Sequence, residues 1–161
     1  MSAFERLGRL HPALVHLPIA ASFLLLPALL LWIARGGGWR EACRLLAWSA
    51  LGGGAFAGLS GLLWARSMEF LPAGGFVPLR PGLFSTHEAL AACGLVPALL
   101  ALLGVERRRP RSALAAALLT AALWGAAGHW GGRMAFPEPE TLSSQIFPEV
   151  PWATSVSPRS S

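Results

Sequence analysis

The chain has 161 residues, of which 54% are hydrophobic and only 13% are charged, and its mean hydropathy is +0.53. A soluble domain is typically about a quarter charged, so this composition excludes an ordinary soluble globule, and the hydrophobicity excludes a disordered chain. The net charge of +5 comes from arginines that bracket long apolar runs, which points to anionic lipid headgroups and not to nucleic acid. The two cysteines are too few and too scattered for a disulfide framework or a zinc cluster.

Four apolar stretches, nearly free of charge, divide the chain. They cover residues 12–34, 45–65, 85–105 and 112–132. A hydrocarbon core about 30 Å thick needs about 20 helical residues at 1.5 Å each, so every stretch is long enough to cross it. The stretches are apolar all round, without the polar stripe of a soluble helix. The sequence therefore predicts an all-α integral membrane protein, with a four-helix up-down-up-down bundle over residues 1–136.

Three further features complete the predicted organisation. The segment Ser85-Thr-His-Glu88 matches a capping box, which predicts that the third helix begins at Ser85. Residues 137–161 are rich in proline, which predicts an extended C-terminal tail. The first stretch is too long for a signal-peptide core and has no small-residue cleavage site after Ala34, so we expect it to be a span. No internal repeat is evident.

The arginines predict the orientation of the bundle. The turn between the first two spans carries three of them and the turn between the last two carries four, and both turns are short. These residues are Arg35, Arg40, Arg44, Arg107, Arg108, Arg109 and Arg111. Short cytoplasmic loops concentrate positive charge, so we expect these turns to be cytoplasmic and both termini, with the tail, to be periplasmic.

All four histidines fall near the predicted periplasmic ends of spans. His11 and His16 lie at the start of the first span, His87 at the start of the third, and His129 near the end of the fourth. His16 and His129 are each four residues, about 6 Å, inside their helix ends, so we expect them at equal depth. Intramembrane histidines usually face the bundle interior, and two imidazoles from different helices can be the axial ligands of a haem iron. His16 and His129 are therefore the first candidate ligands.

His11 and His87 are open to several interpretations. They lie at the membrane surface, where they can be polar interfacial residues, a second axial pair, or ligands of a separate metal. A single site built from His11, His16, His87 and His129 is a further alternative, because imidazole also binds copper and zinc.

Small residues and rim arginines complete the candidate site. A flat macrocycle can lie against the backbone of the fourth helix on the face formed by Ala122, Gly125, His129 and Gly132, which makes Gly125 a candidate cofactor contact. A second stripe, which close helix packing explains equally well, consists of Gly54, Gly58, Gly61 and Ala65. The arginines that can pair with haem propionates, or anchor in headgroups, are Arg133, Arg66 and Arg80.

Three strings resemble the signatures of a bacterial family of four-helix membrane proteins, domain-of-unknown-function family 2231. They are His11-Pro-Ala-Leu-Val-His16-Leu-Pro-Ile-Ala20, Ser85-Thr-His-Glu-Ala-Leu90 and Gly128-His-Trp-Gly-Gly132. The resemblance covers residues 10 to about 136 and implies a four-span inner-membrane fold in which the four histidines are the motif residues. It implies no established activity, although relatives associated with c-type cytochromes favour a role with haem.

The chain departs from that family pattern at two places. The second helix ends in Gly61-Leu-Leu-Trp-Ala65, where the family often has an acidic residue. The segment after Gly132, Arg-Met-Ala-Phe, is less aliphatic than usual in the family. If the acidic residue tunes a ligand in other members, this chain works differently.

We therefore expect a b-type haem electron-transfer subunit with one or two non-covalent haems and no substrate turnover of its own. Covalent attachment is not expected, because the chain has no Cys-x-x-Cys-His motif. With every histidine on one face, the subunit is expected to exchange electrons with a periplasmic c-type cytochrome or with quinol, inside a larger respiratory or photosynthetic complex of other membrane subunits. No nucleic-acid partner is expected.

Two other functions stay open. One is a cofactor-free scaffold subunit of such a complex, and the other is a histidine-ligated copper or zinc site. A transporter is disfavoured, because the spans carry almost no charge and show no inverted repeat.

Overall fold

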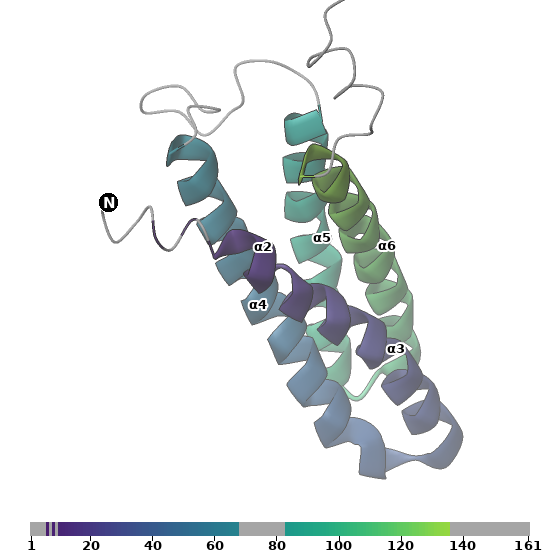
Figure 1. The fold of residues 1–161 in the computed structure, drawn as a ribbon. Coiled ribbons are helices and arrows are strands. Elements are labelled where there is room, and N and C mark those ends of the chain that lie inside the picture. The colour runs from purple at the N-terminus through teal and green to yellow at the C-terminus, as the bar shows by residue number, and fades with distance from the viewer. Residues whose placement is uncertain (1–5, 7, 9, 68–82, 136–161) are drawn as a thin grey trace, which may run out of the picture.

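A computed structural model describes Arg6, Gly8 and residues 10–67 and 83–135, and the regular elements within them are all helical (Figure 1). A short helix α2 (His11–Leu14) precedes α3 (His16–Arg35), and a 3₁₀ helix η1 (Gly37–Trp39) leads into α4 (Arg40–Ser67). The other two long helices are α5 (Leu83–Glu106) and α6 (Pro110–Ala135). The described part of the chain thus has four helices that are long and apolar enough to cross a membrane.

The four long helices form a ring in which each packs against two neighbours, in the order α3, α4, α5, α6 and back to α3. Consecutive helices run in opposite directions, which confirms the predicted up-down-up-down bundle (Figure 1). We call the end that holds η1 and residues 107–109 the loop end, and the opposite end the histidine end. The predicted extended tail, residues 137–161, and the connection over residues 68–82 lie outside the described residues.

The helices extend beyond the predicted apolar stretches. α4 begins at Arg40, five residues before the expected start at residue 45, and α5 begins at Leu83, two residues before the capping box. For α4, absence of charge was the wrong criterion for the helix end, because arginine and glutamate are good helix formers and extend the helix into the interface. The prediction from the capping box that the third helix begins at Ser85 is wrong, because α5 already begins two residues earlier.

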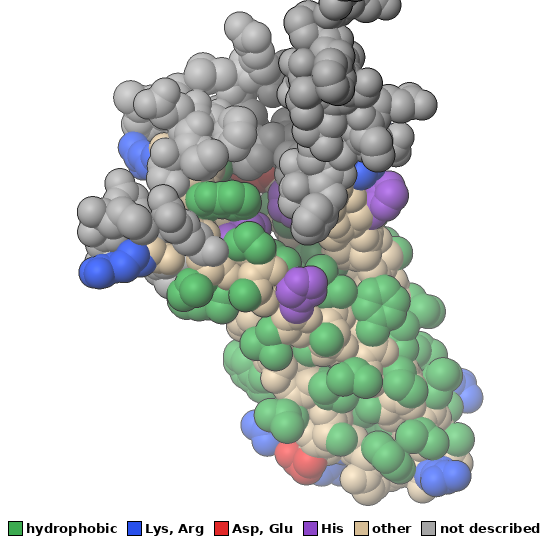
Figure 2. Space-filling view, viewed as in Figure 1, with side chains coloured by type: hydrophobic (Ala, Val, Ile, Leu, Met, Phe, Trp, Pro, Cys, Tyr) green, Lys and Arg blue, Asp and Glu red, His purple; other side chains and the backbone are tan. Residues whose placement is uncertain are grey.

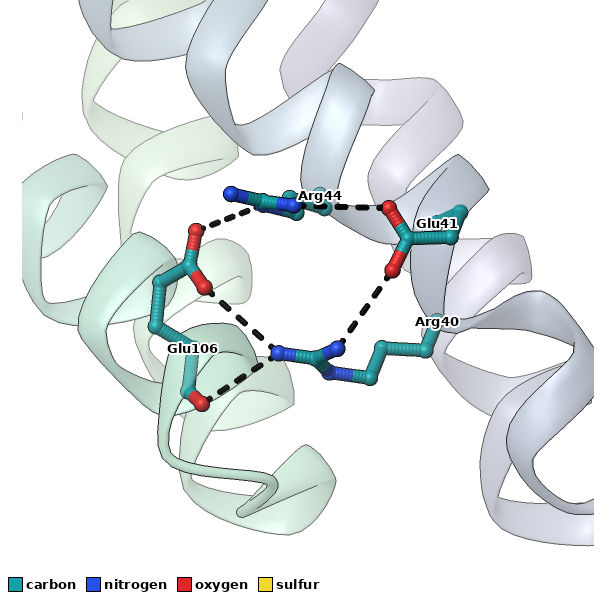
Figure 3. A network of polar contacts seen from close by, with 4 residues as sticks. All are labelled: Arg40, Glu41, Arg44 and Glu106. Atoms are coloured by element: carbon teal, nitrogen blue, oxygen red, sulfur yellow. Dashed lines mark hydrogen bonds and ion pairs between the residues drawn. The ribbon is translucent and has the colours of Figure 1, made fainter.

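An ion-pair network joins α4 to α5 at the loop end (Figure 3). Arg44 Nε donates to Glu106 Oε1 at 2.8 Å, and Arg40 Nη2 lies 3.5 Å from Glu106 Oε2. Both guanidinium groups also approach the Glu41 carboxylate, at 3.4 Å from Arg40 and 3.6 Å from Arg44. Each charge therefore has two neighbours of opposite sign, which fixes the start of α4 against the end of α5.

Pro18 accounts for the break between α2 and α3. A proline has no N–H to donate to the carbonyl four residues earlier, and its ring clashes with that carbonyl. The carbonyl four residues before Pro18 is that of Leu14, where α2 ends. The next hydrogen bond, from Ile19 N to Val15 O, is stretched to 3.5 Å. α2 is consequently a separate turn, and it packs against α4 as well as α3.

Trp124 fills the middle of the bundle. Its side chain is only 4% exposed, and its indole Nε1 donates to the carbonyl of Ala91 at 3.0 Å. The ring lies directly against Gly54 on α4 and Gly94 on α5, at distances that leave no room for a β-carbon at either position. Gly54 is therefore a packing residue, as the close-packing interpretation of its stripe predicts.

Replacing Gly94 by alanine tests this packing. The new methyl group overlaps the Trp124 ring, so we expect a loss of about 1–3 kcal/mol in stability and a clearly lower melting temperature in detergent. Gly52→Ala is the matched control, because a β-carbon there has no heavy atom within 4 Å. Equal melting temperatures for the two variants would contradict the packing.

Candidate functional site

The described histidines lie toward one end of the molecule and a group of arginine and acidic side chains lies at the other, with an apolar surface between them (Figure 2). This arrangement follows from the topology, because α2, α3 and α5 start at the histidine end and α6 finishes there. Two of the four histidines point into the bundle and two point outward.

His11 on α2 is held by α4. Its Nδ1 lies 2.9 Å from the carbonyl oxygen of Ala57 and 3.2 Å from Ser60 Oγ. A carbonyl oxygen only accepts hydrogen bonds, so Nδ1 carries the proton. The Ser60 hydroxyl donates to the same carbonyl at 2.8 Å, which leaves its oxygen free to accept from Nδ1. In the neutral ring the lone pair is therefore on Nε2.

Gly61 permits this approach of His11. A β-carbon at position 61 would lie 2.8 Å from His11 Cε1 and 3.1 Å from Nδ1. Trp64, one turn further along α4, lies beside the imidazole with its ring centroid 5.9 Å away. His11 is partly buried in this setting.

His87 on α5 is held by α6 in the same way. Its Nδ1 donates to the carbonyl oxygen of Ala127 at 2.8 Å, so its lone pair is also on Nε2. A β-carbon at Gly131, four residues further along α6, would lie 3.1 Å from His87 Cε1. His87 is partly buried, as His11 is.

The two held histidines lie next to each other in an edge contact. The ring centroids of His11 and His87 are 6.2 Å apart, and the ring planes are nearly perpendicular at 82°. The first ring belongs to the α2–α3–α4 half of the bundle and the second to the α5–α6 half. The structure thus brings His11 and His87 together. The sequence left their role undecided between polar interfacial residues, a second axial pair and ligands of a separate metal.

The prediction that His16 and His129 face the bundle interior is wrong. Both side chains are exposed. His16 lies five residues after His11, on a different face of the same span, and the His129 ring packs edge-on against Trp130 on its own helix at 5.9 Å. Equal depth along two helices says nothing about the direction in which each side chain points. The alternative of one metal site with four histidine ligands fails for the same reason, and the described residues contain no cluster of three or more His, Cys, Asp or Glu side chains.

The predicted small-residue face of α6 is also misplaced. A β-carbon at Gly125 would meet the Phe23 ring of α3 at 3.6 Å, while Ala122 is exposed. The interior face of α6 is different, and its buried residues are Ala113, Ala117, Thr120, Ala121, Trp124 and Ala127. Gly125 is therefore a contact between α3 and α6 and does not line the site of His11 and His87.

Arg133 stands at the rim of the histidine end. Its guanidinium carbon lies 5.2 Å from the Trp130 ring centroid, in cation–π geometry on the same helix, and its side chain is exposed. Arg66, near the end of α4, is exposed as well. The third predicted rim arginine, Arg80, lies outside the described residues.

The profile of a family described as predicted membrane protein (DUF2231) matches residues 9–138. The chain belongs to this family. The match covers the whole helical bundle and confirms the resemblance of the three sequence strings. No curated protein and no solved structure matches the chain.

One sequence pattern in this DUF2231 chain indicates that α4 and α6 hold His11 and His87 in the same way, but the sequence-based prediction of the site did not include it. The string Ala57-Gly-Leu-Ser-Gly61 on α4 matches Ala127-Gly-His-Trp-Gly131 on α6, each with alanine, glycine and glycine at the same spacing. In both strings the alanine carbonyl accepts from an imidazole and the last glycine lies beneath the ring. The two helix pairs therefore carry the same binding feature, which is a short internal repeat.

The two glycines give a direct test of the histidine geometry in this DUF2231 protein. Long-range ¹H–¹⁵N spectra of the protein in detergent are expected to show neutral His11 and His87 protonated on Nδ1. Gly61→Ala is expected to disturb the His11 resonances alone and Gly131→Ala those of His87 alone, because each methyl group meets only one ring. Protonation on Nε2, or variants that disturb both rings equally, would contradict the arrangement.

Proposed function

We propose that the protein is a membrane-bound b-type haem electron-transfer subunit in which His11 and His87 are the axial ligands. The observation that carries the proposal is the pair of adjacent imidazoles, each fixed by a backbone carbonyl through Nδ1. Metal-binding histidines characteristically donate their second ring N–H in this way, which fixes the tautomer and orients the ring.

The separation of the rings supports an iron between them. Two metal–nitrogen bonds of about 2 Å, with a ring radius of about 1 Å on either side, give about 6 Å between ring centroids. The centroids of His11 and His87 are 6.2 Å apart. The glycines beneath the rings, Gly61 and Gly131, reduce the bulk that α4 and α6 present beside this pair.

The number of ligands favours haem over copper or zinc. Zinc sites in proteins use three or four side-chain ligands, and protein copper sites are similarly built from several. The described residues offer two imidazoles, and no group of three or more His, Cys, Asp or Glu side chains among them is placed to hold one metal ion. Two axial ligands are the number that a haem iron requires of the protein.

A bound haem would supply one-electron chemistry, and the chain's own residues would set its conditions. The Ala57 and Ala127 carbonyls hold both imidazoles in the ligating tautomer and increase their basicity. Trp64 shields His11 from one side, and the apolar helices exclude water. Arg133 and Arg66 are close enough to this end of their helices to be the candidate partners of the propionates.

We place the histidine end in the periplasm and the protein in the bacterial inner membrane. The arginines of the loop end support this orientation through the positive-inside rule. With both ligands at one end, the subunit would exchange electrons there, with a c-type cytochrome or quinol, inside a larger respiratory or photosynthetic complex.

A cofactor-free scaffold is the second candidate function, and one observation favours it. Each imidazole bonds to the neighbouring helix of its own half, His11 to α4 and His87 to α6, so the two bonds can lock helix pairs together without any ligand.

Optical spectra of the purified protein test the proposal. We expect the dithionite-reduced wild type to show b-type cytochrome bands and a haem b pyridine haemochrome. His11→Ala and His87→Ala each remove one axial ligand and are expected to lower the haem content at least tenfold. His16→Ala and His129→Ala are the matched controls and are expected to retain haem, because both side chains are exposed.

Circular dichroism on the same samples separates loss of haem from loss of fold. A wild type without haem, or haem loss in the His16 and His129 variants alone, would overturn the assignment. A haem-free wild type whose His11 and His87 variants melt at lower temperature would instead establish the scaffold.

A further inference from the structure

The loop end of the bundle holds two adjoining pockets, far from the histidines. The first, of about 370 Å³, is lined by Trp32 and Ile33 of α3 and by the start of α6, residues 109–112. The second, of about 440 Å³, shares Trp32 and Pro110 with the first and continues towards α4. Both volumes fall within the range of small-molecule sites.

The first pocket is basic. Arg109 and Arg111 line it, together with Ser112, and no acidic side chain does. The two described carboxylates at this end, Glu41 and Glu106, are both paired with Arg40 and Arg44. Among the described residues no ion pair involves Arg109 or Arg111, so their charge is available to an anion.

The start of α6 adds to this positive charge. A helix N-terminus exposes unpaired N–H groups and the positive end of the helix dipole. α6 has no acidic residue in its first turn, and the residue before its first position, Arg109, has no side-chain acceptor with which to cap those groups. The N–H groups of Arg111 and Ser112 therefore stand beside two guanidinium groups.

The second pocket holds another unpaired donor. Arg40 lines it with Arg108, and the Nε of Arg40 is buried without a hydrogen-bond partner among the described residues. Because the Arg40 side chain is 23% exposed and its other guanidinium nitrogens contact Glu41 and Glu106, Arg40 is not counted as part of the anion site. Glu41 also lines this pocket, but its carboxylate is engaged by Arg40 and Arg44.

The rest of the first pocket is lined by apolar side chains. Trp32 is 7% exposed and Ile33 is 37% exposed, and both belong to the last turn and a half of a span. A soluble anion gains nothing from this wall, whereas the acyl chains of a lipid whose phosphate lies in the basic pocket would pass along it. Basic pockets between membrane helices are known to bind anionic lipid headgroups.

We propose that the loop end binds one anionic phospholipid, with its phosphate held by Arg109, Arg111 and the start of α6 and its chains against Ile33. The site is separate from the histidine site and does not depend on the function proposed for it.

Native mass spectrometry of the full-length protein in detergent tests this proposal. The probes are phosphatidylglycerol and phosphatidylcholine with the same acyl chains. We expect the wild type to retain phosphatidylglycerol preferentially, and the double variant Arg109→Gln/Arg111→Gln to bind it about tenfold more weakly. The matched control is Arg35→Gln/Arg107→Gln, which removes the same charge from exposed positions at the same end outside both pockets and is expected to change binding less than twofold.

Three results would overturn the site. Equal weakening in the two double variants would show diffuse attraction without a site. Equal binding of both lipids would show that charge is not recognised. Displacement of phosphatidylglycerol by millimolar inorganic phosphate or glycerol 1-phosphate would show that the pocket takes a soluble anion and not a lipid. Melting temperatures of the variants verify that all of them are folded.

Discussion

The hydrogen bond from an imidazole to a helix carbonyl is the constraint on which the histidine end depends. A helix carbonyl already accepts a bond from the N–H four residues later, so a side chain reaches its second lone pair only where the neighbouring turn leaves space. Gly61 and Gly131 leave that space. One contact then determines the tautomer, the ring plane and the helix that the ring lies against. The same contact occurs in both halves of the bundle, and the two rings lie next to each other, with centroids 6.2 Å apart.

The two ends of the molecule are built on different chemistry, and the core between them keeps them apart. At the histidine end imidazole rings and glycines create a close approach, whereas at the loop end guanidinium and carboxylate groups tie α4 to α5 (Figure 3). The centre is packed with alanines and Trp124, which favours a rigid connection. The proposed haem ligands near one surface and the proposed lipid site at the other would fit this division.

Much of the fold could be predicted from the sequence, because the length and hydrophobicity of each span are properties of single segments. The site could be predicted only in part. The histidines were found, and their common end follows from the alternating direction of the spans. His11 and His16 are five residues apart, about 140° around a helix, so they point to different faces, and packing decides which face is interior. The partner of each ring depends on which helix face is interior, and that is decided by packing of buried residues such as Trp124.

The most direct test of the account is the proximity of the two imidazoles in a lipid bilayer. In a His16→Gln/His129→Gln variant the only histidines are His11 and His87, so a ring-to-ring contact in a magic-angle-spinning NMR spectrum of ¹³C,¹⁵N-histidine-labelled protein has one assignment. We predict that this contact is observed, as centroids 6.2 Å apart require. If the protein is folded and both rings give resolved signals, the absence of a ring-to-ring contact in the spectrum would contradict the account.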